Sequence, residues 1–254
     1  MREGIVFRAL DFPAEVHPGD NLARLIGDAV AASDDGLRDG DVLVVAQKVV
    51  SKAEGRFVDL AGVSPSPRAT ELARETGKDP RQVEVILRES DEVVRAKPGV
   101  IVVAHRLGLV MANAGIDRSN IGPGEGDRVL LLPEDPDRSA AHIRDALAAR
   151  FGTAPGVIVS DSFGRAWRNG VVNVAIGAAG LPTLIDARGR IDRDGRELAV
   201  TDIAFADAIA AGAGIAMGEG NESAPVALVR GARADAPHGT AASLIRPAAE
   251  DMFR

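Results

Sequence analysis

The chain has 254 residues, of which 46% are hydrophobic and 26% are charged, values that are ordinary for a soluble globular protein. Its formal net charge of -7 argues against nucleic-acid binding through a broad basic surface, so any polyanionic ligand must meet a local basic site. The absence of cysteine excludes disulfides, thiolate catalysis and cysteine-ligated metal centres. No apolar stretch is long enough to span a membrane, and no signal peptide is evident, so we expect a cytoplasmic protein without membrane or nucleic-acid partners.

In the first part of the chain, the hydrophobic pattern predicts strands over residues 5–8 and 41–50. Between them a helix is expected to begin after Gly19-Asp20-Asn21, because Asn and Asp favour the N-cap position. The sequence Ser64-Pro65-Ser66-Pro67 is expected to interrupt regular structure.

The next helix is predicted to begin with Asp79 as N-cap and Pro80 at the first helical position, and to run to about Arg95. Two apolar runs follow at 100–104 and 107–111, separated by a tight turn. They predict an antiparallel hairpin, so the sheet should be at least partly antiparallel.

Further along, Asp135-Pro136 predicts the start of a helix by the same logic, with Gly152 as its stop. Strands are expected over 157–160 and 171–176. The alternating acids and bases of 185–196 indicate a salt-bridged hairpin loop, and the alanine-rich segment 201–216 predicts a helix.

This alternation predicts an α/β (α+β mixed) fold with mixed sheets and flanking helices. A P-loop or Rossmann fold is not expected, because neither phosphate-binding fingerprint occurs. We expect one domain over 1–230, open to division into two interleaved lobes, and a C-terminal tail over 231–254.

Three acids, Asp117, Asp161 and Glu219, each follow an apolar segment. Ligands gather where strands end in α/β proteins, and carboxylates suit Mg²⁺ or Mn²⁺, so the three acids predict a hard-metal site. The alternative for Asp117 is an ordinary turn or helix cap, with Ser119 and Asn120 bonded to the local backbone.

The basic residues include only four lysines, and two of them, Lys48 and Lys52, lie close together after an apolar run. Lysine is a compact point charge that suits a phosphate, although two solvated lysines on a strand edge are an equal alternative. Together with the acids and with glycines that let backbone amides approach an anion, these lysines indicate phosphoryl transfer.

Five segments then resemble, in order, the signatures of the coenzyme F420-0:L-glutamate ligase family. They are residues 51–56, 85–90, 113–120, 161–165 and 218–222. The resemblance covers about residues 10 to 230, and five ordered motifs are far more specific than any one of them.

The resemblance implies roles for individual residues. It makes Asp117, Asp161, Ser162 and Glu219 divalent-metal ligands. It implies nucleotide contacts from Asp11, Phe12, Pro13, Ala14, Gln47, Lys48, Lys52, Asn120, Met217, Gly218, Glu219, Gly220, Asn221, Glu222, Ser223 and Ala224. Lys52 and Arg165 are the candidate catalytic residues. Because guanidinium groups bind carboxylates and phosphates in two-point contacts, the candidate contacts to the acidic substrate are Arg165, Arg168, Asp186 and Arg188.

The activity implied is a GTP-dependent addition of L-glutamate, through γ-linked amide bonds, to coenzyme F420-0 and to F420-1. An acyl phosphate would be the intermediate. The implied cations are Mg²⁺ or Mn²⁺, up to two per site, with K⁺ as an optional further cation, and the implied assembly is a homodimer. Two alternatives stay open: a nucleotide- and metal-binding sensor without turnover, and an amide ligase for another carboxylate substrate.

Overall fold

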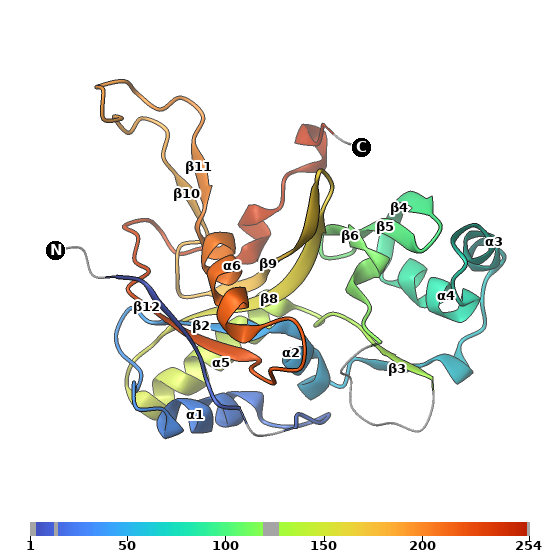
Figure 1. Ribbon diagram of the computed structural model, residues 1–254, viewed down its shortest axis with the longest axis horizontal. Coiled ribbons are helices and arrows are strands. Elements are labelled where there is room, and N and C mark those ends of the chain that lie inside the picture. The colour runs from blue at the N-terminus through green and yellow to red at the C-terminus, as the bar shows by residue number, and fades with distance from the viewer. Residues whose placement is uncertain (1–3, 13–14, 119–126, 253–254) are drawn as a thin grey trace.

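A five-stranded mixed sheet forms the centre of the computed structural model, which describes residues 4–12, 15–118 and 127–252 (Figure 1). Only β2 and β8 run parallel; every other neighbouring pair in this sheet is antiparallel. The strands, in spatial order, are β1 (Val6–Ala9), β12 (Val226–Arg230), β2 (Val42–Ala46), β8 (Gly156–Arg165) and β9 (Arg168–Ala179).

Helices cover both faces of this sheet. Helices α1 (Leu22–Ala32) and α5 (Pro136–Phe151) pack on one face, and α6 (Phe205–Met217) packs on the other (Figure 1). In β2, Leu43 and Val45 join the core with α1 and α5, whereas Val42 and Val44 join the core with α6. A strand that is buried on both faces reads as a continuous apolar run, which is why this strand was evident from the sequence.

A smaller lobe lies beside the central sheet (Figure 1). Its sheet consists of β4 (Ser90–Lys97), β5 (Val100–His105) and β6 (Val110–Ala112). Strands β4 and β5 pack with α3 (Pro67–Thr76) and α4 (Pro80–Arg88) around a separate core, whereas Met111 of β6 belongs to the core of α1 and α5. Two short strands, β3 (Phe57–Asp59) and β7 (Arg128–Leu130), pair with each other and join this lobe to the rest.

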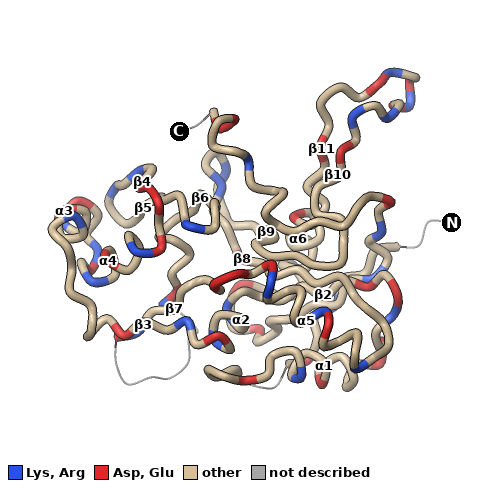
Figure 2. The backbone as a smooth tube through the Cα atoms, turned by 180° about the vertical axis from the view of Figure 1, so that it is seen from behind, with Lys and Arg blue, Asp and Glu red and all other residues tan. Residues whose placement is uncertain are grey.

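Two hairpins extend from the body. One is formed by the outer halves of β8 and β9, and the other by β10 (Leu184–Asp186) and β11 (Asp202–Ala204) with the chain between them. The outer end of the second hairpin carries both acidic and basic residues (Figure 2). After β12, the chain from residue 231 to 252 folds back on the body, where Ala241 N donates to Asp137 Oδ1.

Several sequence predictions are confirmed. The mixed α and β fold is present, and Asn21, Asp79 and Asp135 cap their helices through side-chain hydrogen bonds. Gly152 ends α5 in the left-handed conformation, and the predicted hairpin of β5 and β6 is antiparallel. A separate observation, which confirms no prediction, is that no helix in the described ranges is sufficiently long and apolar to cross a membrane.

Other boundaries were wrong. The strand predicted over 41–50 ends at Ala46, because residues from Gln47 onward form helix α2 (Gln47–Ala53). The helix predicted to reach Arg95 ends at Arg88, and its expected last turn lies in β4, where paired valines suit a strand. Residues 64–66 do interrupt regular structure as predicted, but Pro67 does not, because it begins α3 with Ser66 as N-cap.

Candidate functional site

A cavity of about 600 Å³ opens at one edge of the central sheet. The parallel register pairs Ala46 with Ser160, so Gln47 and Asp161 follow at the same edge. The antiparallel register pairs Val226 with Val45, so the segment that precedes β12 enters at this edge too. Strands β2 and β8 are parallel and both end at this edge, whereas β12 is antiparallel to β2 and begins there. The segments after β2, after β8 and before β12 therefore meet, although they are remote in sequence.

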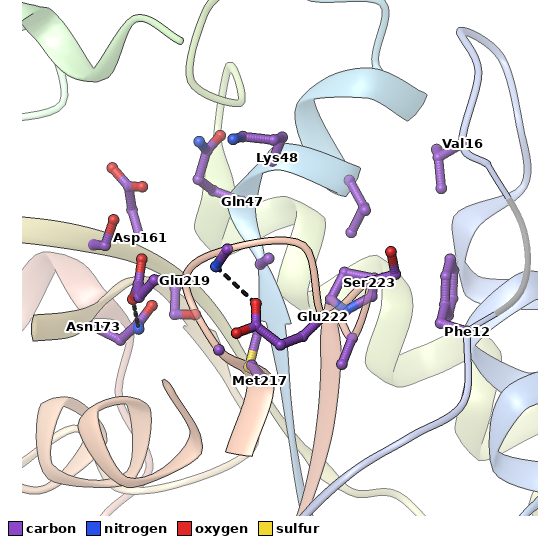
Figure 3. Close-up of a pocket in the computed structure, with 18 of the residues that line it drawn as sticks. Phe12, Val16, Gln47, Lys48, Asp161, Asn173, Met217, Glu219, Glu222 and Ser223 are labelled. Carbon is purple, nitrogen blue, oxygen red and sulfur yellow. Dashed lines mark hydrogen bonds between the residues drawn. The ribbon is translucent and has the colours of Figure 1, made fainter. Parts of the chain in front are cut away.

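Asp117 and Asp161 form the acidic part of this site. The backbone of Asp117 is fixed by two 2.9 Å hydrogen bonds with Leu130. Its Oδ2 accepts a hydrogen bond from Gln47 Nε2 at 3.1 Å and lies 3.5 Å from Lys48 Nζ. Its carboxylate thus faces the cavity and α2 rather than capping a local turn, and Asp161 points toward Gln47 and Lys48 (Figure 3).

Burial makes this pair of acids electrostatically costly. It raises the pKa of Asp161 to about 7, helped by the charge of Asp117, while Gln47 and Lys48 act in the opposite direction. Burial also raises the pKa of Asp117, whereas Lys48 and Gln47 lower it. A bound cation would relieve this cost, since an opposite charge favours the ionised carboxylate.

The amide of Gln47 has a fixed orientation. Ser51, which is fully buried, donates its hydroxyl to Gln47 Oε1 at 2.9 Å, so Nε2 faces Asp117. Lys52 lines the cavity on the same helix, and burial lowers the pKa of its ammonium. Helix α2 therefore supplies one amide and two lysines to the cavity.

Residues 217–224, here called the glycine loop, form another wall of the cavity. Gly218 and Ser223 have positive φ angles of 75° and 56°, so the loop depends on left-handed backbone conformations. Gly220 N donates to Glu222 Oε2 at 2.7 Å, and Asn173 Nδ2 donates to Glu219 Oε1 at 2.7 Å (Figure 3).

The structure brings most of the predicted residues together. The cavity is lined by Phe12, Gln47, Lys48, Lys52, Asp117, Asp161, Ser162 and all eight residues from Met217 to Ala224. Pro13, Ala14 and Asn120 lie outside the described residues.

Five predicted residues do not line the cavity. Asp11 is exposed beside it. Arg165 and Arg168 are exposed at the end of the hairpin of β8 and β9, where Arg165 Nη2 donates to Asn169 O at 2.9 Å. Asp186 and Arg188 form an exposed ion pair with each other at 2.5 Å on the hairpin of β10 and β11. The structure therefore does not gather the predicted substrate contacts at the cavity within one chain.

Sequence reasoning missed Glu15, Val16, Ser160 and Asn173, all of which line the cavity. Asn173 did carry a signal, because it is the one polar residue in the run from Val171 to Ile176. Such a residue in a strand needs a polar partner or solvent.

Two of the motif residues have structural roles. Arg56 pairs with Glu89 at 3.0 Å, and its Nε donates to Leu132 O at 2.9 Å, which ties the chain after α2 to the small lobe. Arg118, which had no predicted role, pairs with Asp127.

The donor set fits a hard cation in part. Among the described residues, no group of three or more His, Cys, Asp or Glu side chains lies close enough to hold a metal. The paired acids and Ser162 nevertheless offer oxygen donors, and the buried Ser160 Oγ has no hydrogen-bond partner. Half-buried carboxylates beside a hydroxyl are donors that Mg²⁺ and Mn²⁺ accept.

Acids, lysines and a glycine-rich loop around one cavity are the groups from which phosphate-binding sites of enzymes are built. Comparison with known proteins gives the family. Residues 13–231 match the family model described as F420-0:Gamma-glutamyl ligase, and the chain belongs to this family.

Similar proteins share most of the chain. A Methanopyrus kandleri protein named coenzyme F420:L-glutamate ligase is 47% identical over 94% of both chains. Proteins of the same name from Methanocaldococcus jannaschii and Methanothermobacter thermautotrophicus are 44% identical over 86% and 43% identical over 94% of both chains, respectively.

Proposed function

We propose that this protein is a GTP-dependent ligase that adds L-glutamate to coenzyme F420-0, and then to F420-1, through γ-linked amide bonds. The family and the names of its relatives support the ligase activity and its two substrates. GTP as the co-substrate, F420-1 as a second acceptor and an acyl-phosphate intermediate are the finer parts of the proposal.

One observation carries the proposal. The cavity joins paired acids, two lysines and a glycine loop from distant parts of the chain, in a volume of about 600 Å³. Ligand sites of several hundred Å³ are large enough for a nucleotide-sized molecule. A sheet edge built from unrelated segments would have no structural need for this mixture of charges.

A divalent cation would be held by Asp117, Asp161, Ser162 and Glu219. When bound, Mg²⁺ or Mn²⁺ neutralises phosphate charge during transfer. Even without it, Lys48 offsets the charge of Asp117, and Lys52 is available to a phosphate group at the same wall. The backbone amides of the glycine loop could provide further anion contacts.

The proposed reaction has two steps. A carboxylate oxygen of the acceptor attacks the γ-phosphorus of GTP, the bond to the bridging oxygen breaks, and GDP and an acyl phosphate form. The glutamate nitrogen then attacks the acyl carbon, phosphate leaves with the bonding electrons, and the surplus proton of the amine passes to phosphate. Neither step needs a covalent protein nucleophile, and no cysteine is available for one.

A homodimer is part of the proposal. Trp167 and Val171 are 82% and 54% exposed near the tip of the β8 and β9 hairpin, and Ile191 and Val200 are 65% and 85% exposed on the neighbouring one. We take these exposed apolar side chains as candidate contacts between two copies of the chain. In a homodimer, Arg165 and Arg168, which flank Trp167, would be placed to meet acidic substrate at the partner's cavity.

The test is a reaction of the purified protein with GTP, Mn²⁺, L-glutamate and F420-0, followed by mass analysis of the coenzyme and measurement of GDP. Added glutamyl units with matching GDP release are expected. Asp161→Asn should abolish both, whereas Asp145→Asn, at an exposed position on α5, should not. GTP binding without any mass increment would favour the sensor alternative, and GDP release with another carboxylate only would favour the other ligase.

A further inference from the structure

Asn173 connects the central sheet to the glycine loop. It lies in β9 opposite Ser162 and lines the cavity. Its Nδ2 donates to Glu219 Oε1 at 2.7 Å (Figure 3). Glu219 itself is exposed, on a loop that depends on left-handed backbone conformations, so this bond holds one carboxylate oxygen of an otherwise free side chain.

The side chain of Asn173 fits against a glycine of α6. A Cβ added at Gly214 would lie 2.9 Å from Asn173 Cγ and closer still to Nδ2. Gly214 is buried in the interior of a helix, where glycine is unfavourable compared with alanine. Its absent side chain is therefore explained by the space that Asn173 occupies.

The hydrogen bond between Asn173 and Glu219 fixes which end of the Asn173 amide faces Glu219. With Nδ2 toward Glu219, the amide donates to a carboxylate; with the amide reversed, two oxygens would face each other. The bond leaves Glu219 Oε2 without a contact to Asn173, so that oxygen can serve another ligand.

We propose that Asn173 is a positioning residue, which fits into the space left by Gly214 and directs Glu219 toward the cation of the cavity. The inference rests on the proposed function, because it takes Glu219 as a cation ligand. Residues that orient a metal ligand typically change metal affinity by tenfold or more when they are replaced.

The test measures Mn²⁺ binding to the intact protein, with and without a non-hydrolysable GTP analogue, and needs no turnover. Asn173→Ala removes the donor, and Gly214→Ala displaces the donor while leaving it in the sequence. Each is expected to weaken Mn²⁺ binding by roughly tenfold. The double variant should be no weaker than either single variant, because both changes break the same contact.

The matched control is Gly212→Ala, at the glycine that lies two residues before Gly214 in the same helix. Its Cβ would lie 2.6 Å from Phe7 Cε1, so it disturbs packing against β1 and not against Asn173. It should lower the melting temperature while leaving Mn²⁺ affinity unchanged.

The outcomes separate the two proposals. If the wild type binds Mn²⁺ and Asn173→Ala binds it equally well, the positioning role is refuted and the proposed function stands. An equal loss in Gly212→Ala, or additive losses in the double variant, would also refute that role. If the wild type binds no Mn²⁺ under either condition, the proposed cation site and the positioning role both fail.

Discussion

His105 should make the stability of this protein depend on pH. The imidazole is fully buried at the end of β5, and burial lowers its pKa to about 4, although Glu89 Oε2 lies 3.8 Å away. Nδ1 accepts the hydrogen bond of Leu107 N at 3.0 Å, in the turn that leads to β6 and on toward Asp117. The native state therefore requires neutral His105.

The sign and size follow from linkage. Below pH 6.5, His105 binds a proton in the unfolded chain, whereas in the native state it stays neutral until the pH falls to about 4. The contribution of neutral His105 is thus complete above pH 6.5 and is lost as pH falls to about 4. A pKa that falls from 6.5 to about 4 corresponds to roughly 3 kcal/mol.

Asp161 acts in the opposite direction over part of this range. Because burial raises its pKa to about 7, its native carboxyl binds a proton before the unfolded one does, and this stabilises the native state as pH falls. The total pH profile therefore mixes both groups. The contribution of His105 has to be measured as the difference between the wild type and a variant.

His105→Asn is the suitable variant, because an amide oxygen can accept the Leu107 hydrogen bond and does not titrate. Free energies of unfolding are measured by urea denaturation from roughly pH 7.5 to 4.5. The wild type should lose about 2 to 3 kcal/mol more than His105→Asn over this range. His142→Asn, at an exposed position, should behave like the wild type. Parallel profiles for the wild type and His105→Asn would refute this reasoning.

Three further predictions concern the site and its support. Asp161→Asn should abolish glutamate addition yet raise the free energy of unfolding of metal-free protein by roughly 2 to 4 kcal/mol at alkaline pH, since it removes a buried charge; lower stability in urea denaturation would contradict this. Lys52→Ala should weaken GTP binding by about tenfold in calorimetry, and unchanged affinity would remove its phosphate role. Gly177→Ala should cost about 2 kcal/mol, because its Cβ would overlap the Pro136 carbonyl, whereas Gly164→Ala, which faces open space, should cost much less in the same assay.

The sequence predicted which residues line the cavity more accurately than it predicted the ends of several elements. Asp117, Asp161 and Glu219 could be found because polar residues that follow apolar runs stand out locally. The end of β2 could not be found in this way, because residues 42–50 are almost continuously apolar and suit either a strand or a buried helix. Gln47 and Val50 are buried on one side of α2, and this burial, which favours the helix over a longer strand, exists only in the folded protein.

Long-range partners were beyond the sequence. Asn173 was missed because its role depends on Gly214 and Glu219, which come from a helix and a loop more than forty residues later. Arg165 and Arg168 were predicted to contact the acidic substrate because guanidinium groups bind carboxylates and phosphates in two-point contacts. The structure instead continues β8 to Arg165, with a register irregularity just before it, and begins β9 at Arg168, so both arginines lie outward on the hairpin.

The path of β8 also explains why the described acids do not form a compact cluster of three. Successive side chains leave opposite faces of a strand, so Asp161 and Ser162 reach the same cavity from different sides of β8. Asp161 joins Asp117 and α2 on one side, whereas Ser162 is paired with Asn173, the partner of Glu219. Glu219 could reach a cation beside Asp161 only from the glycine loop. That loop contains the two positive φ angles at Gly218 and Ser223, so adjustment of the site to its ligand should be concentrated there rather than in the sheet.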